Sequence, residues 1–190
     1  MELRDILSRL YPLTGKSLEN LIAIADELDV RRNTIIIKSG VIERYIYFVK
    51  NGIVRAFFNA DGREVTFWIG EEGSVVLSME SYINNRCGYE TIVTLEDCTL
   101  YRIDSKALNH LYETDIHIAN WGRKLAEREI LRAERCLMPL LFTTGAKRYA
   151  QLLKSNPGLL NRIHLEHLAS YLGVTPVSLS RIRSTLRNSK

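Results

Sequence analysis

The sequence predicts an α+β protein in which an antiparallel β-roll precedes a long helix and a small helical domain. Short β-branched and aromatic segments alternate with glycine turns between residues 30 and 103. An apolar stripe at helical spacing follows from Ile116 to Leu137, and two short amphipathic segments flank Gly173. We expect a β-roll domain over 1–113, a long helix over 114–138 and a small helical domain over 139–190.

The first elements expected are two helices, over residues 2–11 and 17–28, separated at Pro12 and Gly15. Six strands should follow, over residues 34–38, 45–50, 53–59, 64–69, 89–95 and 99–103. Turn signals such as Asn51-Gly52 separate these strands, and glycines recur about every ten residues, as the corners of a compact roll require.

A long helix is expected after a short one over residues 105–112. Residues three and four apart form an apolar stripe along it, namely Ile116, Ala119, Ala126, Ile130, Ala133 and Leu137. Ile118, Trp121 and Leu125 form a flanking row. A stripe of about six turns exceeds what one roll edge covers easily, so we expect a second copy of this helix to pair with it. The alternative is packing on its own domain alone.

The segment 165–187 has the pattern of a helix-turn-helix unit, after a helix over 142–153 and a break at residues 156–158. Ala169 is the small residue that lets the second helix cross the first, and Gly173 can take the positive φ of the turn. Thr175 is a suitable N-cap before Pro176. The facing apolar residues are Leu165, Leu168, Leu172, Val174, Leu179, Ile182 and Leu186. An ordinary helical hairpin is the alternative interpretation.

The outer face of the second helix favours DNA, because short side chains surround one long cation, Arg181. Such a face can enter the major groove, where an arginine binds a guanine edge. The other expected contacts to bases or backbone are Thr175, Val177, Ser178, Ser180 and Ser184. Weaker candidates for phosphate contacts are Lys147, Arg148, Arg183 and Arg187.

The charge distribution supports the same interpretation. Residues 1–137 hold 18 Lys/Arg against 21 Asp/Glu, a net charge of −3. Residues 138–190 hold 8 Lys/Arg against Glu166 alone, a net charge of +7. A basic module beside a mildly acidic one is typical of a regulator with a separate DNA-binding part.

Several other classes of protein are disfavoured. No stretch approaches the ~20 apolar residues that span a bilayer, and residues 1–13 do not resemble a signal peptide, so we expect a cytoplasmic protein without a membrane partner. The three cysteines are scattered and indicate neither a disulfide framework nor a metal pair. The roll has no histidine, and no catalytic motif or phosphate loop occurs, so we expect neither an enzyme nor a bound metal or cofactor.

The order of helices, glycine-cornered roll, long helix and helix-turn-helix resembles the Crp/Fnr family of bacterial transcription regulators. The segments 47–73 and 169–186 carry the most specific likeness. The resemblance implies a homodimer with half-sites about 34 Å apart on DNA, and RNA polymerase as a partner. It assigns Arg181 to guanine. Pro176 and Val177 stand where some members carry Arg and Glu, so we expect a different target sequence.

The resemblance also bears on effectors, because cyclic-nucleotide-binding members hold the phosphate with an Arg-Ser or Arg-Thr pair. Gly88 and Tyr89 occupy those positions here and Glu90 follows, so we expect no cyclic nucleotide unless Arg86 substitutes. An effector-gated regulator is the alternative. Its pocket would use Glu72, Ser78, Glu80, Ser81, Arg86 and Tyr89. Iron–sulfur and haem sensing are disfavoured because no Cys precedes Cys87 and no His precedes His110.

Overall fold

The computed structural model describes the backbone of residues 1–188 and the side chains of residues 1–186. The chain divides into two compact units. Unit 1 comprises Met1–Ala56 with Gly70–Leu131, and unit 2 comprises Phe57–Ile69 with the chain from Arg132 onward. The predicted α+β class is confirmed, and the long helix contributes to both units.

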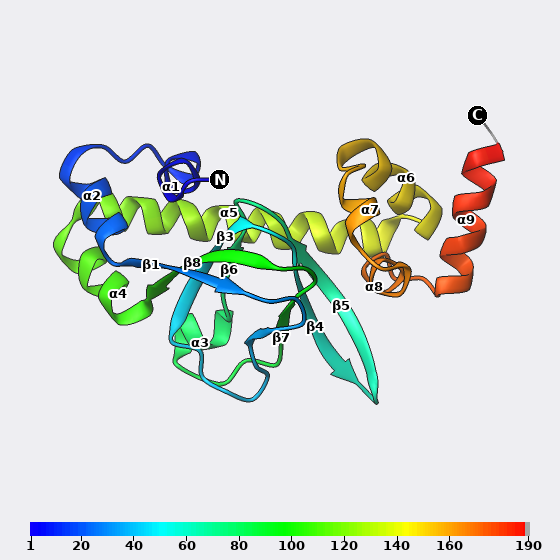
Figure 1. Cartoon of the computed structure of the whole chain (residues 1–190), viewed down its shortest axis with the longest axis horizontal. Helices are drawn as coiled ribbons and strands as arrows, with labels where there is room; N and C mark the ends of the chain where they lie inside the picture. The colour runs from blue at the N-terminus through cyan, green and yellow to red at the C-terminus, as the bar shows by residue number, and fades with distance from the viewer. Residues whose placement is uncertain (189–190) are drawn as a thin grey trace. The chain divides into compact units, whose positions relative to one another are not determined.

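The strands form two four-stranded sheets (Figure 1). The order in the first sheet is β1 (Ala25–Val30), β8 (Cys98–Asp104), β3 (Tyr45–Asn51) and β6 (Val75–Val76). The order in the second sheet is β2 (Ile35–Ile37), β7 (Thr91–Thr94), β4 (Val54–Ala60) and β5 (Arg63–Gly70). The pairs β1–β8, β3–β8, β3–β6 and β2–β7 are antiparallel, in agreement with the predicted roll.

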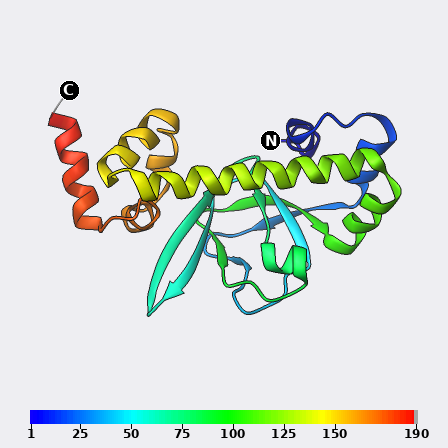
Figure 2. The same cartoon turned by 180° about the vertical axis from the view of Figure 1, so that it is seen from behind.

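Helices of unit 1 build a core around Trp121. The helices of this unit are α1 (Leu3–Leu10), α2 (Gly15–Ala23), α3 (Met79–Asn84), α4 (Ser105–Thr114) and the N-terminal part of α5 (Ile116–Phe142). Figures 1 and 2 both show α1 and α2 beside this part of α5. Trp121 is fully buried; its Nε1 donates a hydrogen bond to the Leu7 carbonyl at 3.0 Å, and its ring lies 6.2 Å from that of Phe48.

The predicted helix over residues 17–28 is wrong in its second half. Helix α2 ends at Ala23, and the acidic segment after it forms the edge strand β1. Polar side chains of β1 meet partners across the sheet: Asp26 pairs with Arg102 at 3.3 Å, and Asp29 accepts a hydrogen bond from Thr99 at 2.7 Å. Tertiary pairing therefore overrides a local pattern that suits a helix.

Other differences concern short elements and helix ends. Strand β6 and helices α3 and α7 (Leu159–Arg162) were not predicted. Helix α5 continues beyond the predicted end at Leu137 and contains Pro139, and α6 (Gly145–Ser155) begins later than predicted because Thr144 caps it. These elements are too short, or too dependent on a single cap, for a periodic pattern to define them.

Unit 2 joins the outer part of the β4–β5 hairpin to α6, α7, α8 (Leu165–Tyr171) and α9 (Pro176–Asn188). Figure 2 shows α6, α7 and α8 gathered at the C-terminal end of α5. The Arg132 guanidinium lies 4.3 Å from the centre of the Trp68 ring, a cation–π contact between α5 and β5. Within residues 1–188, no helix has the length and apolar character that crossing a bilayer demands.

The turn after β3 gives a testable constraint on the roll. Gly52 has φ +108°, and a Cβ there would clash with Cys98 Sγ and lie 3.0 Å from Cys98 Cα. Gly40 has φ +77° but open space around it. We expect Gly40→Ala to lower the free energy of unfolding by about 1–2 kcal/mol, and Gly52→Ala by roughly 1–3 kcal/mol more, because overpacking adds to backbone strain. Urea unfolding followed by tryptophan fluorescence measures both, and equal losses would contradict the close packing.

Candidate functional site

Helices α8 and α9 meet at a tight turn built by the residues predicted for it. Gly173 has φ +62° and donates its N–H to the Ser170 carbonyl at 3.0 Å, while Val174 donates to the Ala169 carbonyl at 3.0 Å. These two bonds form a Schellman motif, which ends a helix at a left-handed residue. Ala169 and Leu179 are fully buried, so the small residue and the apolar face have the predicted places.

The first turn of α9 is fixed by its cap. Thr175 Oγ1 accepts the N–H of Ser178 at 3.1 Å and lies 2.8 Å from the Ser178 hydroxyl. The two hydroxyls predicted to contact DNA therefore also hold each other, and Pro176 begins the helix without needing a hydrogen bond. This arrangement sets the direction in which α9 leaves the turn.

The outward face of α9 presents short side chains around Arg181. Val177 is 62% exposed, and Ser180, Arg181 and Ser184 are exposed as well. The guanidinium of Arg181 forms no hydrogen bond or ion pair with any other residue whose side chain is described. No acidic residue follows Glu166 in the sequence. Among the side chains described, this face thus carries the unneutralised cation of Arg181 within a shallow polar and apolar surface, which suits insertion between two phosphate backbones.

The residues predicted to contact phosphates have different environments. Lys147 is exposed in the first turn of α6, and Arg183 is half-buried on α9. The side chain of Arg187 lies outside the residues described.

Arg148 requires a correction, because its guanidinium is already occupied by carbonyl oxygens. Nε donates to Leu172 O at 2.9 Å, and Nη1 donates to Pro139 O at 3.2 Å and to Thr143 O. Arg148 therefore ties the end of α5 to the end of α8 instead of presenting its charge to a phosphate.

Ser170 is a residue whose role the sequence did not indicate. Its Oγ accepts the Thr66 N–H at 2.8 Å and donates to the Glu64 carbonyl at 3.2 Å. One hydroxyl of α8 thus bridges two backbone groups of β5. Nothing in the local sequence distinguishes this serine from a solvated one, because its partners lie about a hundred residues away, at separations of 104 and 106.

The two apolar rows of α5 have different environments. Ile118, Trp121 and Leu125 are buried in the core of unit 1. The stripe predicted for dimerisation faces outward instead: Ile116 and Ile130 are each 69% exposed and Leu137 is 50% exposed. Ala126 and Ala133 are exposed too, and Ala119 is half-buried. The stripe is therefore left uncovered by its own chain along most of its length.

The loop around α3 brings together part of the predicted effector pocket. Ser78 caps α3, and the Ser81 hydroxyl accepts the Glu43 N–H at 3.0 Å and donates to the Arg86 carbonyl at 2.9 Å. A Cβ at Gly88 would clash with Ser78 Oγ and lie 2.6 Å from Glu90 Oε1. The resemblance assigns a phosphate-binding arginine to this position, and a side chain here would require Ser78 Oγ and the Glu90 carboxylate to move.

Glu90, which the set of predicted pocket residues did not include, gives this loop its electrostatic character. It is 6% exposed, and its Oε1 has no hydrogen-bond partner in the described part of the chain. A buried carboxylate with a free oxygen disfavours an anionic ligand nearby. Burial, together with the charge of Glu90, raises the pKa of the neighbouring Tyr89 above its ordinary value.

The remaining predicted pocket residues do not converge on this loop. Glu72 Oε1 accepts the Gly52 N–H at 2.9 Å, so its carboxylate is held at the turn after β3. Glu80 Oε2 accepts a hydrogen bond from its neighbour Asn84 at 3.0 Å. Arg86 and Tyr89 are exposed, with Tyr89 64% accessible. Ser78 and Ser81 therefore lie close to Gly88 and Glu90. The side chains of the other predicted pocket residues do not converge on a common site with them: Glu72, Glu80, Arg86 and Tyr89.

Comparison with known proteins agrees with this architecture. Residues 27–115 match the cyclic nucleotide-binding domain family. FixK2 from Bradyrhizobium japonicum superposes with a TM-score of 0.74 at 21% identity, covering 87% of this chain and 86% of its own. The c-di-GMP-responsive global regulator CLP from Xanthomonas campestris gives 0.71 at 20% identity, covering 91% of each chain.

A third similar structure is a protein from Eubacterium rectale described as a transcriptional regulator of the Crp/Fnr family. Its TM-score is 0.73 at 18% identity, with coverage of 95% of this chain and 88% of its own. No curated protein sequence is significantly similar to the chain. Residues 27–115 are therefore similar to the cyclic nucleotide-binding domain family, and the chain as a whole has the fold seen in Crp/Fnr regulators.

Proposed function

We propose that this chain is a homodimeric transcription regulator that reads a two-fold related DNA site with α9. The observation that carries the proposal is the exposed face of α9, where Arg181 has no partner among the described side chains. Proteins of the same fold include one named a global regulator and one described as a transcriptional regulator. Partnership with RNA polymerase would follow from that role.

Sequence recognition would depend on the chemistry of this face. Arg181 can donate two parallel hydrogen bonds to N7 and O6 of a guanine, and the Val177 methyl groups can contact a thymine methyl. Serine hydroxyls at positions 180 and 184 are short enough to reach base edges or phosphates without holding the helix away from the groove. The net charge of +7 over residues 138–190 would supply the salt-dependent attraction to phosphate.

Dimerisation would use the outward stripe of α5. Ile130 and Leu137 expose large apolar side chains, and Leu141 and Phe142 extend the exposed apolar surface beyond the predicted end of the stripe. A second copy is the natural partner, because self-complementary two-fold pairing of one helix covers the same stripe on both chains. Two such chains would present two α9 helices to successive turns of the major groove, about 34 Å apart.

Cyclic nucleotides would not be the trigger in this proposal. Gly88 leaves no room for a phosphate-binding arginine, and Glu90 places a buried carboxylate beside it. Either feature alone weakens an anion site, and the two together oppose one. The regulator would therefore bind its operator without cyclic AMP.

Arg181→Ala tests the base-reading role. With a duplex selected by the purified protein, we expect affinity to fall by about 1–3 kcal/mol, and the preference for one base pair of the half-site to be lost. Arg183→Ala on the same helix is the matched control, and should weaken binding to selected and random duplexes alike. Fluorescence anisotropy at ~150 mM salt measures both. An equal loss on random DNA for Arg181→Ala would exclude guanine recognition.

The double substitution Ile130→Gln, Leu137→Gln tests the dimer interface. Removing two large apolar side chains from a buried helix pair should raise the dimer dissociation constant at least about a hundredfold. Arg128→Gln, at an exposed polar position of the same helix, should leave it unchanged. Sedimentation velocity gives the assembly state, and circular dichroism checks folding. A double variant whose dimer dissociation constant stays within about tenfold of the parent value would place the interface elsewhere.

Thermal unfolding with cyclic AMP tests the effector prediction. A nucleotide bound with a Kd of about 10 μM would, at ~1 mM, raise the free energy of unfolding by about 2.7 kcal/mol. We expect no shift in the Tm and no change in affinity for the selected duplex. A shift that disappears in Arg86→Gln would show that Arg86 takes over the phosphate.

A further inference from the structure

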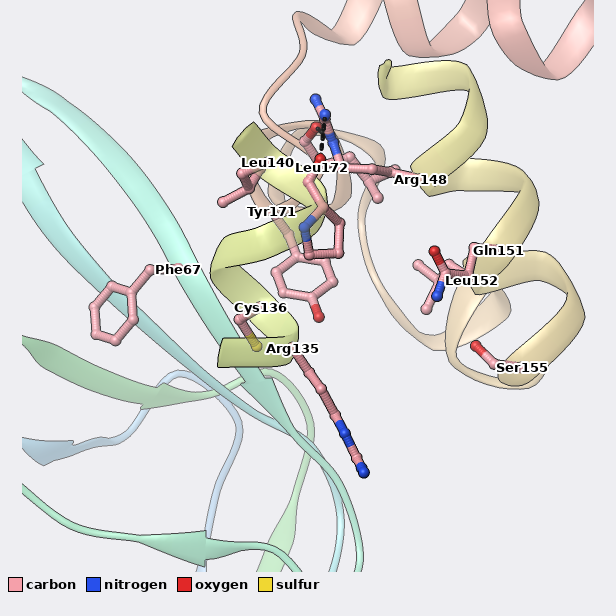
Figure 3. A pocket seen from close by; sticks show the side chains of 11 residues that line it. Phe67, Arg135, Cys136, Leu140, Arg148, Gln151, Leu152, Ser155, Tyr171 and Leu172 are labelled. Carbon is pink, nitrogen blue, oxygen red and sulfur yellow. Dashed lines mark hydrogen bonds between the residues drawn. The ribbon is translucent and has the colours of Figure 1, made fainter. Parts of the chain in front are cut away.

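Unit 2 contains a cavity of about 150 Å³ that none of the roles proposed above uses (Figure 3). It opens between the C-terminal turns of α5, helix α6, the end of α8 and strand β5. Its lining includes Phe67, Arg135, Cys136, Gln151, Leu152 and Tyr171. Every lining residue belongs to the same compact unit, so its geometry is set by local packing within that unit.

The cavity combines apolar walls with one available cation. Phe67, Leu152 and Tyr171 contribute aromatic and aliphatic surface. Figure 3 shows the side chains of Arg148 and Arg135 extending in opposite directions, with Arg135 at the edge of the site beneath Tyr171 in this view. The guanidinium of Arg148 is bound to carbonyl oxygens, whereas Arg135 is exposed and makes no hydrogen bond or ion pair with the side chains described here.

The volume limits what such a site can hold. A cavity of about 150 Å³ accommodates a single benzene-sized ring, whereas pockets for larger ligands measure about 300–1,000 Å³. A cyclic nucleotide is therefore too large. A guanidinium without a partner at the edge of an apolar site selects a carboxylate, which it can bind through two parallel hydrogen bonds.

We propose that this cavity binds a small aromatic carboxylate, with its ring against Tyr171 and Leu152 and its carboxylate on Arg135. The site is separate from the α3 loop of the roll, and it does not depend on the proposed DNA binding. A ligand bound there would contact α5, α6 and α8. These are the three helices that the hydrogen bonds of Arg148 connect.

Cys136 provides a direct test, because its thiol lines the cavity while Cys87 is exposed on the roll. The full chain is alkylated with iodoacetamide in increasing benzoate, and modification of each cysteine is followed by mass spectrometry of peptides. We expect benzoate to slow the labelling of Cys136 several-fold and to leave Cys87 unaffected. Benzyl alcohol, the neutral analogue of similar size, should protect much less.

Arg135→Gln should weaken protection by benzoate about tenfold or more, because a charge-assisted pair is lost. Arg128→Gln lies on the same helix but outside the cavity, so in this variant benzoate should protect Cys136 as well as it does in the parent chain. Three results would overturn the proposal: no protection up to ~10 mM benzoate, the weakest binding expected for a ligand of this size; equal protection by benzyl alcohol; or undiminished protection in Arg135→Gln.

Discussion

Burial of Trp121 is the constraint on which the arrangement of α5 depends. The indole is fully enclosed, hydrogen-bonded to the Leu7 carbonyl and packed against Phe48. A tryptophan of this kind removes a large apolar surface from water, so rotating the helix to expose it would be very unfavourable. Because Trp121 fixes which row of α5 faces the core, it also fixes which row, with Ile116 and Ile130, faces away. The surface proposed for a second copy follows from the core packing of the first.

Two arginines of the helical unit have different environments. The guanidinium of Arg148 donates hydrogen bonds to carbonyl oxygens near the ends of α5 and α8, where helices have carbonyls left to satisfy. The Schellman turn at Gly173 then directs α9 outward, with its cap at Thr175. Arg181 is left at the surface without a partner among the described side chains. The base readout that we propose for it would depend on the rigid turn that positions α9.

The roll combines a family architecture with an altered ligand loop. Ser78, Ser81 and the short helix α3 keep the loop ordered through caps and side-chain hydrogen bonds. A Cβ at Gly88 would clash with Ser78 Oγ, and the Glu90 carboxylate is buried beside it, which is why we propose that this loop holds no phosphate-binding arginine. Structural similarity at about 20% identity establishes this fold, while the chemistry of the loop has to be derived from its own residues.

The sequence by itself determined six of the strands of the roll, the periodicity of α5 and the helix-turn-helix unit, because each depends on local spacing and on residues such as Gly173 and Pro176. Tertiary structure alone decided that residues 25–30 form a strand, since that state requires β8 as a partner far along the chain. It also decided that Arg148 binds carbonyls while Arg181 stays free, and that Ser170 bridges β5. Residue type gives a side chain its charge and its donors, but only long-range packing decides which partners lie within reach.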